Sequence, residues 1–188
     1  PRTQHLPWSP GGTDDDKRMS DEDAAELIAH EHVVTVKMDG ENTNMYRDHI
    51  HARSIDSKHT EDRDWVKQLW SQIRFDIPEG WRLCGENLFA KHAIKYTNLP
   101  SYFMLFSIWN ERNECLSWAE TKEWAALLGL EMVPEVGYVE ERHAGNFGKS
   151  AYDYFADIRC KDLYGSECEG YVIRRVSSFP LRDFKKAV

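Results

Sequence analysis

Residues 32–42 read HVVTVKMDGEN, and this stretch decides how the rest of the chain is interpreted. The β-branched residues of 32–38 alternate as in a strand with one buried face, so a strand is predicted there. Asp39-Gly40 follows as a turn signal. Lys37 therefore stands at the end of an apolar strand, where burial disfavours the charged form of an amine. Because a neutral amine is a nucleophile, Lys37 is a candidate catalytic residue. The plainer alternative is that Lys37 is an ordinary surface lysine at the end of a hairpin.

The segments on either side predict an α+β protein with antiparallel sheets, because strands dominate and the regular alternation of strands with helices is missing. We treat residues 1–188 as one domain, with residues 1–18 as an extended or looping N-terminal arm rich in proline and glycine. Helices are predicted over 20–30, 62–73, 117–128 and, more weakly, 151–158. Further strands are predicted over 44–47, 49–53, 81–88, 102–109, 131–138 and 169–176, with a loop at 143–150.

The composition narrows the class of protein. Hydrophobic residues make up 41% of the 188 residues and aromatic residues 12%, which excludes a mainly disordered chain. The mean hydropathy is −0.66 and no apolar run is long enough to cross a bilayer, so we expect no membrane segment. The net charge of −8 argues against a polybasic nucleic-acid coat but leaves room for a local anion site. Four cysteines without a CxxC pair indicate free thiols and a cytoplasmic location.

Charged residues on apolar segments form the second signal. Glu86 lies within the apolar segment WRLCGENLFA, Glu169 opens EGYVIRRV, and Arg53 follows a short strand. Charges on buried elements are costly unless they are paired or used. The plainer alternatives to a functional site are that Glu86 pairs with Arg82 and that Glu169 is an ordinary residue at the start of a strand. Taken together and in this order, these residues and Lys37 predict one site for a nucleotide and its metal.

The ordered set resembles the covalent nucleotidyltransferases, which comprise the ATP-dependent RNA and DNA ligases and the mRNA capping enzymes. It is most similar to small RNA ligases of the phage RNA ligase 2 kind. The first motif, Lys-x-x-Gly-x-Asn, stands here as Lys37, Gly40 and Asn42. The later motifs are matched by Arg53 in HARS, Glu86 in GEN, Phe106 in FMLFSIW and Glu169 in EGYVIR.

This resemblance implies an adenylyltransferase (ATP-grasp-like) domain, with a nucleotide between two antiparallel sheets and helices outside. Lys37, Asn42 and Arg53 would be catalytic, with Lys37 carrying AMP as a lysyl-adenylate. The nucleotide would be held by Val36, Lys37, Arg53, Glu86, Phe106, Glu169, Lys185 and Lys186. Glu169 and Glu86 would bind Mg²⁺ or Mn²⁺. The substrates would be ATP and RNA with 5′-phosphate and 3′-hydroxyl ends, the protein a monomer, and no membrane would be involved.

The C-terminal region departs from the family pattern. The resemblance expects an essential lysine roughly twenty residues after Glu169, and Lys185 and Lys186 come somewhat earlier. Either these lysines serve, or the motif is truncated and its lysine lies past Val188, which is the reading we favour. Arg174, Arg175 and Arg182 are candidate phosphate contacts, with a solvated strand edge as the alternative.

Three other functions stay open from the sequence. Within the same class, the chain could be a DNA nick-sealing ligase. It could also be a non-catalytic RNA-binding or repair-accessory domain that keeps the pocket without turnover. A third alternative is a metal-dependent hydrolase that uses His49, His51 and Glu86, although zinc sites need further ligands at suitable spacing.

Overall fold

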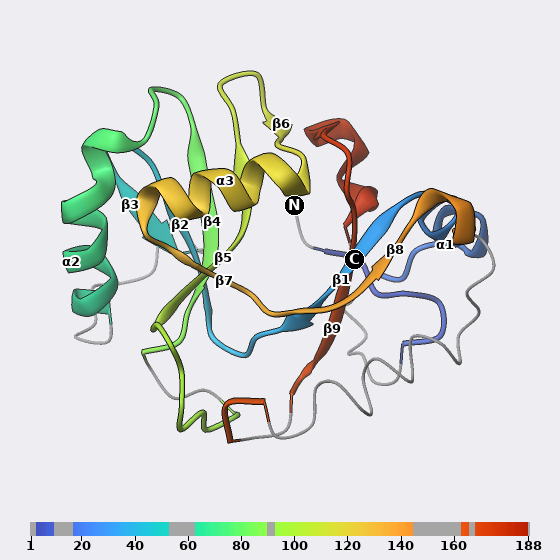
Figure 1. Cartoon of the computed structure of the whole chain (residues 1–188), viewed down its shortest axis with the longest axis horizontal. Helices are drawn as coiled ribbons and strands as arrows, with labels where there is room; N and C mark the ends of the chain where they lie inside the picture. Colours follow the sequence, from blue (N-terminus) through green and yellow to red (C-terminus); the bar gives the residue numbers. More distant parts are fainter. Residues whose placement is uncertain are drawn as a thin grey trace.

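The computed structural model describes residues 3–9, 17–52, 63–89, 93–144, 163–165 and 168–187. Within these residues the chain forms two sheets with helices on their outer sides (Figure 1). The helices are α1 Asp21–Ile28, α2 Asp64–Ile73 and α3 Trp118–Leu128. The strands are β1 His32–Lys37, β2 Glu41–Met45, β3 Ile50–Ala52, β4 Arg82–Asn87, β5 Phe103–Trp109, β6 Glu114–Cys115, β7 Glu131–Met132, β8 Glu135–Val139, β9 Gly170–Arg175 and β10 Phe179–Pro180. Short 3-10 helices occur at η2 Arg74–Asp76, η3 Glu141–His143, η5 Leu163–Gly165 and η6 Leu181–Lys186.

The smaller sheet has the order β8-β1-β9, and both of its pairings are antiparallel. Strand β1 is central and buried along its whole length except at Lys37. This burial explains its run of β-branched residues, because a central strand packs on both faces. The register pairs Lys37 with Gly170, so the end of β1 lies beside the start of β9.

The larger sheet has the order β10-β6-β5-β4-β2-β3. Strand β7 departs from the expected antiparallel pattern, because it pairs with β5 in parallel. The α+β class is confirmed, and the strand expected over 131–138 is divided into β7 and β8 on either side of Pro134. The β2 strand begins at Glu41, whereas the sequence predicted a strand over 44–47.

Helices α2 and α3 pack against the larger sheet, and α1 packs against the smaller one. Val66 and Ile73 of α2 and Ala125 of α3 share a core with Leu83 and Leu105 of the sheet. The predicted helix starts are confirmed by their caps, since Ser20 accepts from the backbone of Asp23 and Ser117 forms a capping box with Glu120. Gly129 ends α3 with φ of 65°, a left-handed conformation that glycine adopts without strain.

The N-terminal arm is described in part, whereas one predicted helix and most of one predicted loop are not. Residues 3–9 run beside residues 17–19, where the backbone of His5 bonds to Lys17 and Met19, and Leu6 is buried. The predicted helix over 151–158 and loop residues 145–150 lie outside the described residues. In the part of the chain that the structure describes, none of the helices has the length and apolar character needed to cross a membrane.

Candidate active site

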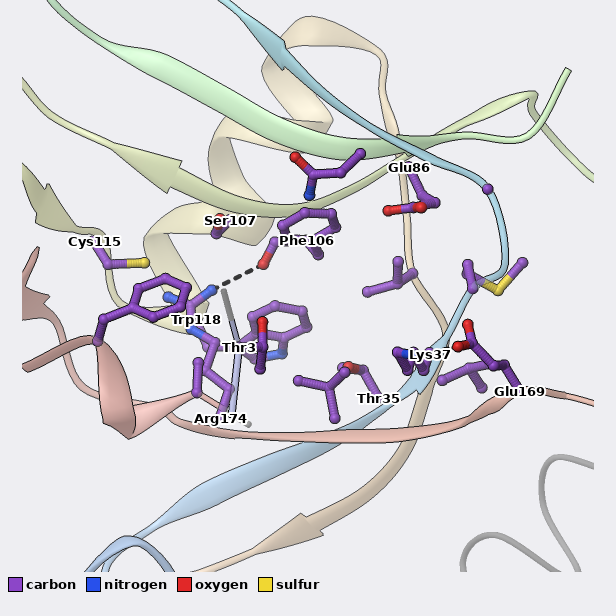
Figure 2. Close-up of a pocket in the computed structure, with 18 of the residues that line it drawn as sticks. Thr3, Thr35, Lys37, Glu86, Phe106, Ser107, Cys115, Trp118, Glu169 and Arg174 are labelled. Atoms are coloured by element: carbon purple, nitrogen blue, oxygen red, sulfur yellow. Dashed lines mark hydrogen bonds and ion pairs between the residues drawn. The ribbon is translucent and has the colours of Figure 1, made fainter. Parts of the chain in front are cut away.

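A cavity of about 340 Å³ lies between the two sheets. One wall comes from β1 and β9, and the other comes from β2, β4 and β5. Lys37, Glu86 and Glu169 gather at one end of the cavity, and Cys115, Trp118 and Arg174 stand at the other (Figure 2). The ends of the cavity therefore differ in character. The first carries the amine of Lys37 and three acids, Asp39, Glu86 and Glu169, and the second carries the buried cation of Arg174 among apolar side chains.

Lys37 lies where the buried strand β1 reaches solvent. Its side chain is 46% exposed and its Nζ forms an ion pair with Oε1 of Glu169, which is 37% exposed. The pairing of Lys37 with Gly170 brings these residues together across a gap of 132 positions in sequence. The amine predicted at the strand end thus sits in the cavity beside a predicted carboxylate.

The turn after Lys37 brings the second acid to the same place. A Cβ atom at Gly40 would lie 2.5 Å from the Asn87 carbonyl oxygen and 2.8 Å from Cδ2 of Leu88, so only glycine allows this close approach to β4. Asn42 then pairs with Glu86 in the register of β2 and β4. Asn42 and Glu86 both line the cavity, as the sequence predicted for a shared site.

The electrostatics of Glu86 are unusual for a glutamate. Burial and, next, the negative charge of Glu169 raise the pKa of Glu86 to about 8, against the opposing effects of the Gly40 backbone N–H and Lys37. Neighbouring carboxylates repel each other unless one of them is protonated or a cation binds to both. Without a cation, Glu86 is therefore mostly protonated at neutral pH.

This pair of acids suits a hard divalent cation, because carboxylate oxygens are the ligands that Mg²⁺ and Mn²⁺ prefer. Among the described residues, no group of three or more His, Cys, Asp or Glu side chains could hold a metal ion. A cation at Glu86 and Glu169 would therefore take its remaining ligands from water and from a phosphate. That requirement is typical of Mg²⁺ sites, which are completed by the substrate.

Apolar side chains form a slot further into the cavity. Phe106 of β5 lines it from the larger sheet, and Val172 of β9 lines it from the smaller one. Val36 also borders the cavity, but it precedes Lys37 on β1 and its buried side chain faces the other side of that strand. An aromatic ring facing an aliphatic side chain is a suitable seat for a planar base. Val172 was not predicted, although it shares a strand face with Gly170 and Arg174 by the alternation of β9.

Arg174 closes the inner end of the cavity. It is 4% exposed, its Nη1 donates to the carbonyl oxygen of Phe106 at 3.1 Å, and its Nη2 donates to that of Leu116. Its guanidinium also lies over the rings of Trp118 and Phe179, at 5.2 and 5.9 Å from their centroids. Arg174 thus links β9 to β5 across the gap between the sheets and fixes the strand segment that carries Phe106. Burial lowers its pKa.

Comparison with known proteins agrees with this geometry. The RNA ligase family matches residues 30–188, which is most of the chain. The chain belongs to the RNA ligase family. No curated protein sequence is significantly similar to it.

Solved structures of a Naegleria gruberi RNA ligase show the same fold. The form with pyrophosphate aligns with a TM-score of 0.57 at 21% identity, over 82% of this chain and 50% of that one. A variant with AMP and Mn has a TM-score of 0.57 at 19% identity, over 86% and 53% of the two chains. A variant with ATP and Mn has a TM-score of 0.54 at 20% identity, again over 86% and 53%. This chain therefore spans about half the length of the RNA ligase chains that it matches.

The residues expected from the RNA ligase motifs fall into two groups. Those brought to the cavity are Val36, Lys37, Asn42, Glu86, Phe106 and Glu169. Arg53 lies outside the described residues, and so does the side chain of Lys186. Lys185 was expected to hold the nucleotide, but the structure places it elsewhere. Its Nζ contacts Asp23 at 2.6 Å and Glu26 at 3.8 Å on α1, while Phe184 and Ala187 of the same segment line the cavity.

Two further expectations need correction. The solvated strand edge, which was the alternative to phosphate contact for Arg174 and Arg175, is wrong, because both side chains are buried. Arg175 points away from the cavity, and its Nη2 donates to the carbonyl oxygen of Glu26 at 2.7 Å. Arg182 is exposed. The hydrolase alternative also lacks its site, since His49 and His51 stack at 5.9 Å and do not line the cavity with Glu86.

Proposed function

We propose that this chain is the adenylyltransferase domain of an ATP-dependent RNA ligase. Membership of the RNA ligase family supports the reaction class. The observation that carries the proposal is the placement of Lys37 beside Glu169, at the end of the cavity that also holds Glu86, while the inner part of the cavity is an aromatic and aliphatic slot. This arrangement suits a nucleotide whose base enters the slot and whose phosphates lie at the acids.

In the first step, Nζ of Lys37 attacks the α-phosphorus of ATP. A nitrogen–phosphorus bond forms, the bond to the β-phosphate oxygen breaks, and pyrophosphate leaves. The Lys37 ammonium must first lose a proton. Its Nζ donates a hydrogen bond to the Glu169 carboxylate. Mg²⁺ or Mn²⁺ bound by Glu169 and Glu86 would neutralise phosphate charge. Phe106 and Val172 would hold adenine.

In the later steps, the AMP group passes to RNA. The 5′-phosphate of RNA displaces Lys37 from the α-phosphorus, and the 3′-hydroxyl of a second end then displaces AMP and seals the strand. Asn42 lies on β2, opposite Glu86, and lines the cavity. We assign Asn42 to these transfer steps, and Arg53 to the ribose and its surroundings, by their match to the family motifs.

The test is the intact mass of the protein after incubation with ATP and Mg²⁺, with and without added pyrophosphate. We expect a gain of one adenylate on the peptide that contains Lys37, and its removal by pyrophosphate. Lys37→Ala should not be labelled, whereas Lys122→Ala, whose side chain is similarly exposed at 50%, should be labelled as the wild type is. Labelling of Lys37→Ala would refute the assignment of the nucleophile.

The acceptor is identified with the labelled protein. Sealing of RNA ends but not of a DNA nick supports the RNA ligase, and the reverse result supports the DNA ligase alternative. A protein that binds RNA but gains no adenylate would be an accessory domain.

A further inference from the structure

Three rings outside the nucleotide cavity form a cluster at the β2–β3 hairpin. The ring centroids of Tyr46 and His49 are 4.2 Å apart and their planes differ by 12°. His51 lies 5.7 Å from Tyr46 and 5.9 Å from His49, with planes that differ by 25° and 13°. The three rings are therefore nearly parallel, and the proposed adenylation chemistry does not use them.

The sheet register places this cluster on the face that also lines the cavity. Asn42 pairs with Glu86, and Asn44 pairs with His51, so these four side chains point to the same side of the sheet. Nδ2 of Asn44 donates to Oδ1 of Asn42 at 3.1 Å. A strip of polar side chains therefore runs along β2 from the cavity at Asn42 to the rings.

The strip is accessible to a ligand. The alternate residues Thr43 and Met45 are buried in the core, whereas Asn42, Asn44, Tyr46 and His51 are half-buried. The His49 side chain is 53% exposed. An exposed cluster of parallel rings adds little to the hydrophobic core, and it offers a flat surface for another ring.

The charges around the rings are mixed. Arg47 donates to the carbonyl oxygens of Phe75 and Ile77, and Arg74 donates to that of Arg47. These neutral acceptors leave both positive charges at the hairpin. Asp48 is the nearby acid, and it accepts a hydrogen bond from His49 at 2.6 Å. Two arginines and Asp48 therefore lie at the hairpin, in a chain whose net charge is −8.

The ring geometry favours stacking over metal binding. The lone pairs of two imidazoles lie in their ring planes, so stacked, parallel rings cannot direct both at one ion. Nδ1 of His51 is bonded to the Ala52 carbonyl oxygen at 2.6 Å, and Nδ1 of His49 is bonded to Asp48. The cluster therefore presents ring faces and edges.

We propose that the strip formed by Asn42, Asn44, Tyr46, His49 and His51 binds an unpaired segment of RNA, with one nucleobase stacked on the rings. This inference rests on the proposed function, since it supplies the path by which an RNA end reaches the cavity. A base can stack on a side chain only when it is free of its neighbours, which selects single-stranded RNA over a duplex. The asparagine amides provide donors and acceptors for base edges and 2′-hydroxyls. In a chain whose net charge is −8, stacking supplies affinity in addition to any contact of phosphates with Arg47 and Arg74.

The test compares the binding of a 5′-phosphorylated, single-stranded RNA oligonucleotide to the whole chain by fluorescence anisotropy. The double variant His49→Ala/His51→Ala should bind about 5- to 150-fold more weakly, the range expected for losing one stacked base. The double variant His49→Phe/His51→Phe keeps the rings and should bind within about threefold of the wild type. His143→Ala, which removes an exposed histidine next to the smaller sheet, is the matched control and should not change binding.

Two further arms make the proposal refutable. The same oligonucleotide annealed to its complement should show no difference between the wild type and the double alanine variant. Bases of the single strand are also replaced one at a time by abasic sites. At one position this replacement should abolish the difference in binding between the wild type and the double alanine variant. The stacking proposal would be overturned if the phenylalanine variant lost as much RNA affinity as the alanine variant. It would also be overturned if the alanine variant lost as much affinity for the duplex as for the single strand. Adenylation with ATP alone is measured on the same samples, so that a chain that binds RNA through the rings but gains no adenylate refutes only the proposed function.

Discussion

The raised pKa of Glu86 leads to a quantitative prediction for the variant Glu86→Gln. The Glu86 carboxyl titrates at about 8 in the folded protein and near 4.5 in a free chain. That difference corresponds to at most about 5 kcal/mol. Glutamine has the same shape, can accept from the Gly40 N–H, and carries no charge. The substitution therefore removes the cost of ionising Glu86 and changes little else in the packing.

The sign of the effect follows from proton binding. Between pH 4.5 and 8 the folded protein keeps the proton of Glu86 while the unfolded chain has lost it, so the wild type loses stability as the pH rises through this window. Below pH 4.5 the carboxyl is protonated in both states and contributes no difference. Glu86→Gln should therefore match the wild type at pH 4.5 and become progressively more stable than it up to about pH 8.

Thermal unfolding of both proteins between pH 4.5 and 9 measures this divergence. For a chain of this size, 5 kcal/mol corresponds to a Tm difference of about 10–20 °C, which is the upper bound of the expected effect. Glu79→Gln removes an exposed carboxylate and is the control. A Tm difference between Glu86→Gln and the wild type that does not vary with pH would refute the reasoning.

Added cation gives a second check on the same variant. A divalent ion at Glu86 and Glu169 must displace the proton of Glu86, so its apparent affinity for the wild type should rise with pH until about pH 8. Mg²⁺ or Mn²⁺ should raise the Tm of the wild type at pH 8, because a ligand that binds only the folded state stabilises it. Glu86→Gln should gain clearly less. Equal stabilisation of both proteins would place the cation elsewhere.

Two further predictions concern the turn and the C-terminal segment. Gly40→Ala should lower the free energy of unfolding by about 1–3 kcal/mol in urea titrations and reduce adenylation, because its Cβ would collide with the Asn87 carbonyl oxygen and push Lys37 away from Glu86. Unchanged stability would contradict the close approach. Lys185→Ala should leave the rate of adenylation unchanged, because its Nζ contacts acids on α1 and not the cavity. A tenfold slower rate would return Lys185 to the nucleotide site.

The strand that ends at Lys37 could be predicted because its sequence and its environment agree. Its β-branched residues suit a central strand, and the polar Lys37 is the exposed residue at its end. The helix starts at Ser20 and Ser117 were predictable for a similar reason, since a capping side chain bonds to a backbone only three residues away. Interactions that are local in sequence are the ones that a single sequence records.

The start of β2 was missed because its stability is not local. Residues 41–44 read ENTN, a composition that rarely favours strands. They form a strand because β4 supplies partners for them, with Glu41 opposite Asn87 and Asn42 opposite Glu86. That pairing depends on the turn at Gly40, whose contact with β4 spans more than forty residues. The misplacement of Lys185 has a comparable cause, because spacing along the chain does not specify which side of a 3-10 helix faces the cavity.

The different environments of Arg174 and Arg175 could have been predicted in part from the sequence. Neighbours on a strand point to opposite faces, so these arginines had to differ in environment once residues 169–176 were predicted to be a strand. Counting by twos from Gly170, which pairs with Lys37, assigns Val172 and Arg174 to the cavity side and Arg175 to the helix side. The sequence could not show that both sides are buried, and this matters for function. Arg174 bonds to the Phe106 carbonyl and so couples the two sheets at the slot, whereas Arg175 anchors α1 through Glu26. A buried arginine can thus act on the cavity through the backbone, because it fixes the strand segment that carries Phe106 relative to β9.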